Sequence, residues 1–276
     1  MSSPGQDVSD RDPARRDDGG NGRPHNGAGS PDGMAIKLEC VTKTFDDRKV
    51  LDDVTLEVPQ GTAFCLLGRS GTGKSVTLKH IIGLLRPDRG HVYVRGKDVP
   101  SLDTRELAEV RRSMGFLFQN AALFDSISVG ENVAFPMRRH TDWSDSKIRE
   151  AARAKLADVD LEKDYDKMPA ELSGGMKKRA GLARAMALDP DILLVDEPSA
   201  GLDPITSREI DDLLVALKKK GTTLVVVTHN IPSARHIGDE LAMLHEGRVI
   251  AQGTAEELER SDNDLVRAFM QSEGGG

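Results

Sequence analysis

The segment TAFCLLGRSGTGKSVTLKHIIGLL, residues 62–85, decides the fold of this chain. It opens with a short apolar run, passes through a glycine-rich stretch and ends with apolar residues at helical spacing. An unbroken apolar run is typical of a strand that is buried on both faces, and such a strand needs helices on either side of its sheet. The segment therefore predicts a strand, loop and helix at the start of an α/β fold.

The glycine-rich stretch fits the pattern G-x-x-x-x-G-K-[ST], and its position between a strand and a helix is the context that this pattern requires. Glycines let successive backbone N–H groups turn inward around phosphate oxygens, and the helix N-terminus adds a partial positive charge. Lys74 can then reach the β and γ phosphates, and Ser75 can ligate magnesium. The predicted nucleotide-binding residues of this loop are Gly68, Arg69, Ser70, Gly71, Thr72, Gly73, Lys74, Ser75 and Val76.

The rest of the chain extends this pattern. Residues 36–45 and 48–61 alternate apolar and polar positions, which predicts antiparallel strands with one solvated face. A further strand is expected at 114–119, buried strands are expected at 191–198 and 222–229, and an amphipathic helix is expected over 206–220. Strands that alternate with helices imply parallel crossovers. A mostly helical stretch at about 120–185 is interpreted as a helical subdomain inserted in one domain that spans 34–276, and Ser144 or Asp145 is a candidate helix cap.

Composition limits the class of protein. The chain has 276 residues with 38% hydrophobic content, enough for a proper core. Its apolar runs are far shorter than the roughly 18 residues that cross a bilayer. The net charge of −7 argues against a general nucleic-acid binder, and two cysteines suggest no disulfide framework, so we expect a reducing cytoplasm. Residues 1–33 are interpreted as a disordered tail, with a docking tail or a true start at Met34 as alternatives.

Polar side chains stand where predicted strands end. The carboxylate of Asp196 can hold the magnesium shell, directly or through water, and Glu197 is a candidate general base for the attacking water. Gln119 and His229 follow two other strands. In open α/β sheets the ligand crevice lies at the carboxyl ends of the strands, so we expect both to face the nucleotide. Simple helix caps and structural roles are the alternatives.

Together these residues resemble the ATP-binding subunit of an ABC transporter, from about Ile36 to the region of Leu258. The resemblance implies the P-loop ABC ATPase fold, with a RecA-like parallel-sheet core, an antiparallel β subdomain and an inserted α-helical subdomain. It implies ATP and Mg²⁺ as cofactors. It makes GRSGTGKS the Walker A loop, ILLVDE the Walker B strand, Gln119 a catalytic and metal-binding Q-loop residue, and His229 the catalytic switch histidine. Phe45 either stacks on adenine or belongs to the hairpin core.

A second glycine-rich segment, LSGGM, resembles the family signature, and SAGLD at Ser199–Asp203 resembles its D-loop. In the family two subunits lie head to tail. By that resemblance Ser173, Gly174, Gly175 and Asp203 serve the nucleotide held by the facing subunit, and the single copy of each motif implies a homodimer.

Residues 122–138, with the signature and D-loop regions, look like the ATPase of Mla-type, MCE-associated phospholipid transporters. That resemblance implies an integral membrane permease, an MCE-domain lipid-binding partner and a peripheral place on the cytoplasmic face of the inner membrane. Met176 either marks this subgroup or simply fills space. Another ABC importer or exporter is the alternative, and an ABC-type ATPase acting on DNA or ribosomes is a third. One further set either lines a permease groove or packs the helical insert: Leu123, Phe124, Ile127, Val129, Val133 and Phe135.

Overall fold

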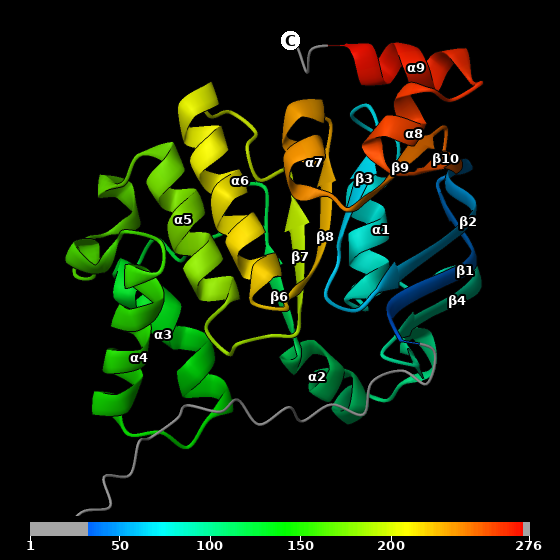
Figure 1. Ribbon diagram of the computed structural model, residues 1–276. Helices are drawn as coiled ribbons and strands as arrows, with labels where there is room; N and C mark the ends of the chain where they lie inside the picture. The colour runs from blue at the N-terminus through cyan, green and yellow to red at the C-terminus, as the bar shows by residue number, and fades with distance from the viewer. Residues whose placement is uncertain (1–32, 273–276) are drawn as a thin grey trace, which may run out of the picture.

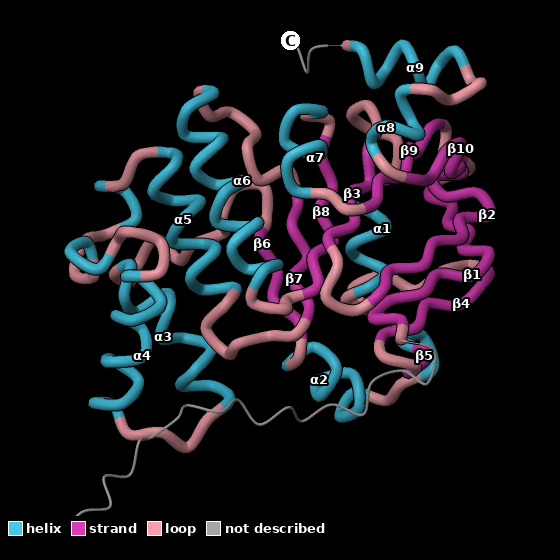
Figure 2. The backbone as a smooth tube through the Cα atoms, viewed as in Figure 1, coloured by secondary structure: helices cyan, strands magenta, loops and turns pink. Residues whose placement is uncertain are grey.

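A computed structural model describes residues 33–272 of the chain. Apart from Gly33, the predicted disordered tail at 1–33 lies outside the described residues. The described chain forms two sheets with helices packed around the larger one (Figures 1 and 2).

The smaller sheet is antiparallel and has the strand order β2-β1-β4-β5. Its strands are β1 (Met34–Phe45), β2 (Arg48–Pro59), β4 (Arg89–Val94) and β5 (Lys97–Asp98). Buried and exposed positions alternate along the second half of β2, as the sequence pattern predicts. A bulge between Leu38 and Val41 was not predicted; there Cys40 takes a left-handed backbone with a φ of 51°.

The larger sheet has the order β10-β9-β3-β8-β7-β6. Its strands are β3 (Ala63–Leu67), β6 (Met114–Leu117), β7 (Ile192–Asp196), β8 (Thr223–Thr228), β9 (Glu240–His245) and β10 (Arg248–Gly253). All neighbours are parallel except the β9–β10 pair. Every residue of β3, β7 and β8 is buried, which confirms the predicted two-sided burial.

Nine α-helices surround these sheets in the described part of the chain. They are α1 (Lys74–Ile81), α2 (Thr104–Arg112), α3 (Val129–His140), α4 (Asp145–Ala157), α5 (Gly174–Ala185), α6 (Pro204–Lys219), α7 (Ile231–Ile237), α8 (Ala255–Glu259) and α9 (Asp264–Gln271). Short 3₁₀ turns are η1 (Val99–Ser101), η2 (Glu162–Asp164) and η3 (Pro169–Glu171).

Alternate residues of the parallel strands enter two separate cores because side chains of a strand point to opposite faces. Cys65 packs with side chains from α3 through α9, whereas Phe64 and Leu66 pack with the antiparallel sheet, α1 and α2. Figure 1 shows α5, α6 and α7 side by side across one face of the sheet. Because β3, β6, β7, β8 and β9 run parallel, their carboxyl ends lie at one common edge of the sheet.

Helices α3, α4 and α5 fall in the stretch for which an inserted helical subdomain is predicted, and α3 and α4 pack together at one side of the molecule (Figure 1). Ser144, one of two candidates, is the residue that caps α4, since its hydroxyl accepts a hydrogen bond from the Lys147 N–H. The limits of about 120–185 for a separate subdomain stay a prediction.

Candidate functional site

The side chains that follow β3, β6, β7 and β8 line one open cavity of about 250 Å³. Parallel strands end at the same edge of the sheet, so residues far apart in sequence meet there. The lining residues are Val50, Ser70, Gly71, Gly73, Lys74, Ser75, Val76, Gln119, Glu197 and His229. Gln119 and His229 line this cavity together with the glycine-rich loop, although β6 ends two residues before Gln119. That both face a nucleotide stays a prediction.

The glycines of this loop are needed for its shape. Gly68 and Gly73 have φ angles of 156° and 108°, and a Cβ on either would meet a backbone carbonyl oxygen, that of Leu244 or of Val50. Gly73 also precedes α1, which starts without a side-chain cap. The first N–H groups of a helix attract anions, so the loop and the helix start are suited to phosphate.

Lys74 is folded into the loop. Its ammonium donates to the carbonyl oxygens of Gly68 at 2.8 Å and Arg69 at 3.2 Å, and it lies 3.3 Å from Glu197 Oε1. Arg69 does not line the cavity with its side chain; nor does Thr72, whose hydroxyl donates to the Arg69 carbonyl at 2.9 Å. These two predicted residues shape the loop from outside the cavity.

Ser75 and Asp196 meet beside the cavity. The Ser75 hydroxyl donates to Asp196 Oδ1 at 2.9 Å. Burial raises the pKa of Asp196, and the Ser75 hydrogen bond opposes that rise. A carboxylate that has lost much of its hydration is favoured by a nearby cation, and carboxylate and hydroxyl oxygens are ligands that Mg²⁺ accepts together with phosphate oxygens and waters. The residues present therefore fit the predicted magnesium ion.

Glu197 is held from several directions. It has a φ of 46°, unusual for a residue with a side chain, and its N–H donates to the Val227 carbonyl at 2.9 Å. Its Oε2 lies 2.9 Å from His229 Nδ1 and accepts a hydrogen bond from the His229 backbone N–H at 3.3 Å. Its own carbonyl oxygen accepts a hydrogen bond from the Lys178 ammonium at 2.9 Å.

Lys178 and Val50 are residues of this site that sequence reasoning missed; Val50 lines the cavity, and Lys178 contacts Glu197. In the sequence Lys178 stands in the basic run MKKR, in which one lysine does not stand out from the next. In the structure Lys178 is 5% exposed, and burial lowers its pKa against the opposing influence of Asp196 and Glu197. Only the fold, by bringing α5 against the end of β7, distinguishes this lysine from its neighbour Lys177.

The signature and D-loop residues form a second group. Ser173 caps α5, because its hydroxyl accepts the Met176 N–H at 3.2 Å. Gly175 packs against Thr206, whose hydroxyl donates to Asp203 at 2.6 Å, and Asp203 in turn caps α6. Ser173, Gly174, Gly175 and Asp203 do not line the cavity of their own chain. The side chain of Met176 is half-buried and packs against the core, as its space-filling interpretation expects.

Phe45 lies at the end of β1 and is 39% exposed, so the hairpin-core interpretation is wrong for this residue. It is not part of the cavity lining, and the Lys43 ammonium stands 5.4 Å from its ring centre. The same hairpin contacts the phosphate loop, since Arg48 donates to the Gly71 carbonyl at 3.4 Å. Phe45 thus lies on a hairpin whose turn is attached to the loop.

The six apolar residues after Gln119 differ in burial, and Ile127 is half-buried. Val129 and Val133 are fully buried and belong to the core, and Leu123 packs against it. Phe124 and Phe135 are 45% and 48% exposed, with their ring centres 5.0 Å apart. The two phenylalanines therefore form an exposed aromatic pair, and core packing is wrong for them.

Two polar side chains fix the segment that carries this pair, and neither was predicted. Buried Asn132 accepts the Phe124 N–H at 2.7 Å and donates to the Phe124 carbonyl at 3.1 Å. Arg184 of α5 donates to the carbonyls of Ala121 at 2.7 Å and Ala122 at 2.6 Å, two residues with positive φ. The segment after Gln119 is thereby attached to α5.

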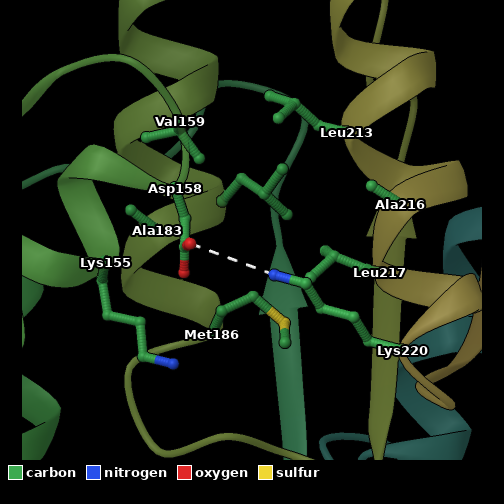
Figure 3. A pocket seen from close by; sticks show the side chains of 10 residues that line it. Lys155, Asp158, Val159, Ala183, Met186, Leu213, Ala216, Leu217 and Lys220 are labelled. Carbon is green, nitrogen blue, oxygen red and sulfur yellow. Dashed lines mark ion pairs between the residues drawn. The ribbon is translucent and has the colours of Figure 1, made fainter.

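A separate small cavity of about 40 Å³ lies between α4, α5 and α6 (Figure 3). Apolar side chains such as Leu182 and Met186 form most of its wall, and Asp158 faces Lys220 across it at 3.9 Å. None of the predicted nucleotide or metal residues lines this cavity.

The fold and the cavity define a P-loop nucleotide-binding protein with its phosphate loop, acidic strand end and polar strand ends in one place. The family model for ABC transporters matches residues 51–200, and the chain belongs to the ABC transporter family. It is an ATPase that uses ATP with Mg²⁺. No helix in residues 33–272 has the length and apolar character needed to cross a membrane.

Three relatives illustrate the match. The chain is 44% identical to the probable ribonucleotide transport ATP-binding protein mkl of Mycobacterium leprae, over 91% of this chain and 71% of that protein. It is 41% identical to the intermembrane phospholipid transport system ATP-binding protein MlaF of Haemophilus influenzae, over 87% and 92% of the two chains. A solved dimeric ATP-binding cassette with ADP and Pi bound matches with a TM-score of 0.74 and 35% identity, over 79% of this chain and 98% of that one.

Proposed function

We propose that this chain is the motor of a transporter that moves phospholipid between two membranes. It would act at the cytoplasmic face of the inner membrane as a homodimer, bound to an integral membrane permease and working with an MCE-domain lipid-binding partner. The observation that supports this proposal is the similarity to an ATPase named for intermembrane phospholipid transport, of which the chain covers 92%.

The geometry supports the proposed catalytic roles. Glu197 is the general base that takes a proton from the attacking water, and His229 orients it through the 2.9 Å contact between Oε2 and Nδ1. Lys74 binds the β and γ phosphates. Ser75, Asp196 and Gln119 would hold Mg²⁺, which would supply positive charge to neutralise the phosphate oxygens.

The separation of the two glycine-rich segments supports the proposed dimer. Ser173–Gly175 and Asp203 cluster at the starts of α5 and α6 but do not line the cavity of their own chain. A helix start with exposed Ser173 and Gly174 is suited to bind phosphate from another molecule. In a head-to-tail dimer this cluster completes the nucleotide site of the partner, and each ATP then joins two chains.

The exposed pair Phe124 and Phe135 is the proposed docking surface for the permease. Exposed neighbouring aromatic side chains mark interaction sites more often than isolated ones. The backbone segment that carries Phe124 begins beside Gln119, which lines the nucleotide cavity. Movement at the nucleotide would therefore reach the permease through a short segment that Asn132 and Arg184 hold in shape.

Transport of a ribonucleotide by another kind of ABC system is the second candidate. It is favoured by the 44% identity to the mycobacterial protein named for probable ribonucleotide transport. The catalytic residues serve both candidates equally, because they act on ATP and not on the cargo.

Cargo is the property that separates the two candidates. The complex would be purified with its co-encoded membrane proteins, and bound molecules identified by mass spectrometry, with a Glu197→Gln complex beside it. We expect phospholipid in the complex and ATP-dependent lipid transfer between vesicles only with the unmutated ATPase. A bound ribonucleotide, with no lipid transfer, would contradict the proposal in favour of the second candidate.

A further inference from the structure

Lys178 carries an inference that deepens the proposed function and rests on it, specifically on Glu197 as the base and on the head-to-tail dimer. We propose that Lys178 is a positioning residue that links the signature helix to Glu197 and so couples the two ATP sites of the dimer. The residue does not touch ATP in this proposal; it acts through the backbone of Glu197.

The first argument is the cost of placing a lysine here. Its ammonium is 5% exposed and donates to the carbonyl oxygen of Glu197 at 2.9 Å. Burying an ammonium removes most of its hydration, a cost that an apolar side chain would avoid. Half-buried Met176, two residues earlier in the same helix, fills space without that cost. Lys178 is a buried charge, and it donates its hydrogen bond to the backbone of the proposed base. This combination indicates a function beyond packing.

The second argument is the backbone of Glu197. A φ of 46° at a residue with a long side chain is strained and persists only where its surroundings fix it. The N–H of Glu197 is fixed by Val227 of β8. Its carboxylate is held by His229, which follows β8, and by Lys74 at the start of α1. Its carbonyl is fixed by Lys178, which comes from a different element. Loss of that hydrogen bond frees the peptide after Glu197 to rotate, and the carboxylate is then no longer oriented toward the attacking water.

The third argument is the position of Lys178 within α5. Ser173 caps the helix, Lys178 lies five residues further on, and Arg184 holds the segment after Gln119. A helix rises about 1.5 Å per residue, so Ser173 and Lys178 are separated by only about 8 Å of rigid backbone. When Ser173 engages the partner's nucleotide, the displacement of α5 acts on Glu197 in the chain's own site. Coupling between sites must be reciprocal, so each site would report its occupancy to the other.

Lys218 provides a matched control. It is also a lysine whose ammonium donates to a backbone carbonyl, that of Ile237 at 3.0 Å, and it contacts Asp239 at 2.7 Å. It does not line the nucleotide cavity. Lys218→Met therefore removes a comparable bond from the fold without affecting the proposed base.

The test compares Lys178→Met, Lys178→Arg and Lys218→Met in the complete transporter complex. We expect Lys178→Met to lower kcat by about 10- to 100-fold, because misplacing a reacting group by about 1 Å has effects of that size. KM for ATP and the affinity for a fluorescent ATP analogue stay close to wild type, while the Hill coefficient for ATP falls toward one. Lys178→Arg, which keeps a charged donor, recovers part of kcat and of the Hill coefficient. Lys218→Met alters only thermal stability.

The inference is wrong if Lys178→Met changes kcat no more than Lys218→Met does, or if the Hill coefficient is unchanged. If Lys178→Met does not fold, Lys178→Ala, which also removes the donor to the Glu197 carbonyl, takes its place, and wild-type kcat and cooperativity in that variant would overturn the inference. Failure of the proposed function would give a different result. Glu197→Gln would then hydrolyse ATP, or it would form no ATP-driven dimer.

Discussion

The ammonium of Lys74 lies 3.3 Å from Oε1 of Glu197, and both side chains are largely buried, with 6% and 11% exposed. The cation proposed to bind phosphate and the carboxylate proposed to act as base are thus paired with each other. A γ-phosphate would bring negative charge close to Glu197 and compete for the same ammonium. Removing the charge of Glu197 should therefore keep or raise the affinity for ATP, whereas removing the charge of Lys74 should lower it.

Glu197→Gln should nearly abolish hydrolysis while leaving ATP binding as tight as in the wild type or tighter. The amide cannot take a proton, which removes about 10²- to 10⁴-fold of rate, and it no longer competes for Lys74. Turnover is measured by phosphate release, and a stable dimer in ATP by size-exclusion chromatography. Glu246→Gln, on an exposed turn, is the control. Retention of half the wild-type rate would contradict the assignment of the base.

Lys74→Ala should weaken ATP binding, because a charge-assisted contact with phosphate is lost. It should also lower the melting temperature, since it leaves the mostly buried Glu197 carboxylate without its cation. Binding of a fluorescent ATP analogue and thermal unfolding measure the two effects. Lys79→Ala, on an exposed position of the same helix, should alter neither. Unchanged ATP affinity in Lys74→Ala would count against the phosphate role.

The main features of this fold were predictable because local signals agreed with long-range ones. The run AFCLL is apolar at every position, and that pattern needs a sheet covered on both faces, which is what β3 has. The bulge at Cys40 was not predictable, since nothing in the alternation of β1 indicates a residue with positive φ. Likewise, β6 ends before Gln119 although the apolar pattern continues to Phe118.

The candidate site likewise contains residues that the sequence predicts and residues that it does not. Lys74, Ser75 and Glu197 belong to short motifs whose spacing itself reflects their chemistry, and the structure brings them together. Lys178 acts on a carbonyl 19 residues away in sequence, and Arg184 on carbonyls 62 and 63 residues away. A basic residue in a helix has no local signal for such a contact, because the packing of α5 alone determines which side chain faces inward.

Ser173→Arg should leave ATP binding by a single chain intact but prevent ATP-driven dimerisation. A bulky cation at the start of α5 would occupy the place where the partner's γ-phosphate must approach. The variant is made in the Glu197→Gln background, and dimer formation is followed by analytical ultracentrifugation. Ser146→Arg, on an exposed position of α4, is the control and should dimerise normally. A normal ATP-dependent dimer in Ser173→Arg would show that Ser173 does not serve the partner's site.

The two cysteines should differ sharply in reactivity. Cys40 is exposed, whereas Cys65 is completely buried in β3, and burial raises the pKa of its thiol to about 12. Because the thiolate is the reactive form, Ellman's reagent should label one thiol rapidly in the folded chain and the second only in denaturant. The Cys40→Ser variant should lose the rapid phase. Rapid labelling of two thiols without denaturant would contradict the packing of β3.

Asp211 should make the folded chain less stable as the pH rises. This α6 residue is 3% exposed, its Oδ2 accepts the Ser233 hydroxyl at 2.7 Å, and burial raises its pKa above the ordinary value of 3.8. His236 and Arg208 oppose that rise, and Asp212 adds to it. Between the unfolded and folded pKa values the folded state binds more protons, so stability falls as pH rises through that window.

Asp211→Asn removes the ionisable group and keeps an oxygen that can accept the Ser233 hydroxyl. The melting temperature of Asp211→Asn minus that of the wild type should therefore be higher at about pH 7 than at about pH 4. Only the wild type must ionise a buried carboxyl across that range. Thermal unfolding followed by circular dichroism measures the difference. Asp262→Asn, at an exposed position, should show no such change between the two pH values. An equal difference at both would mean that Asp211 does not hold its proton above the ordinary range.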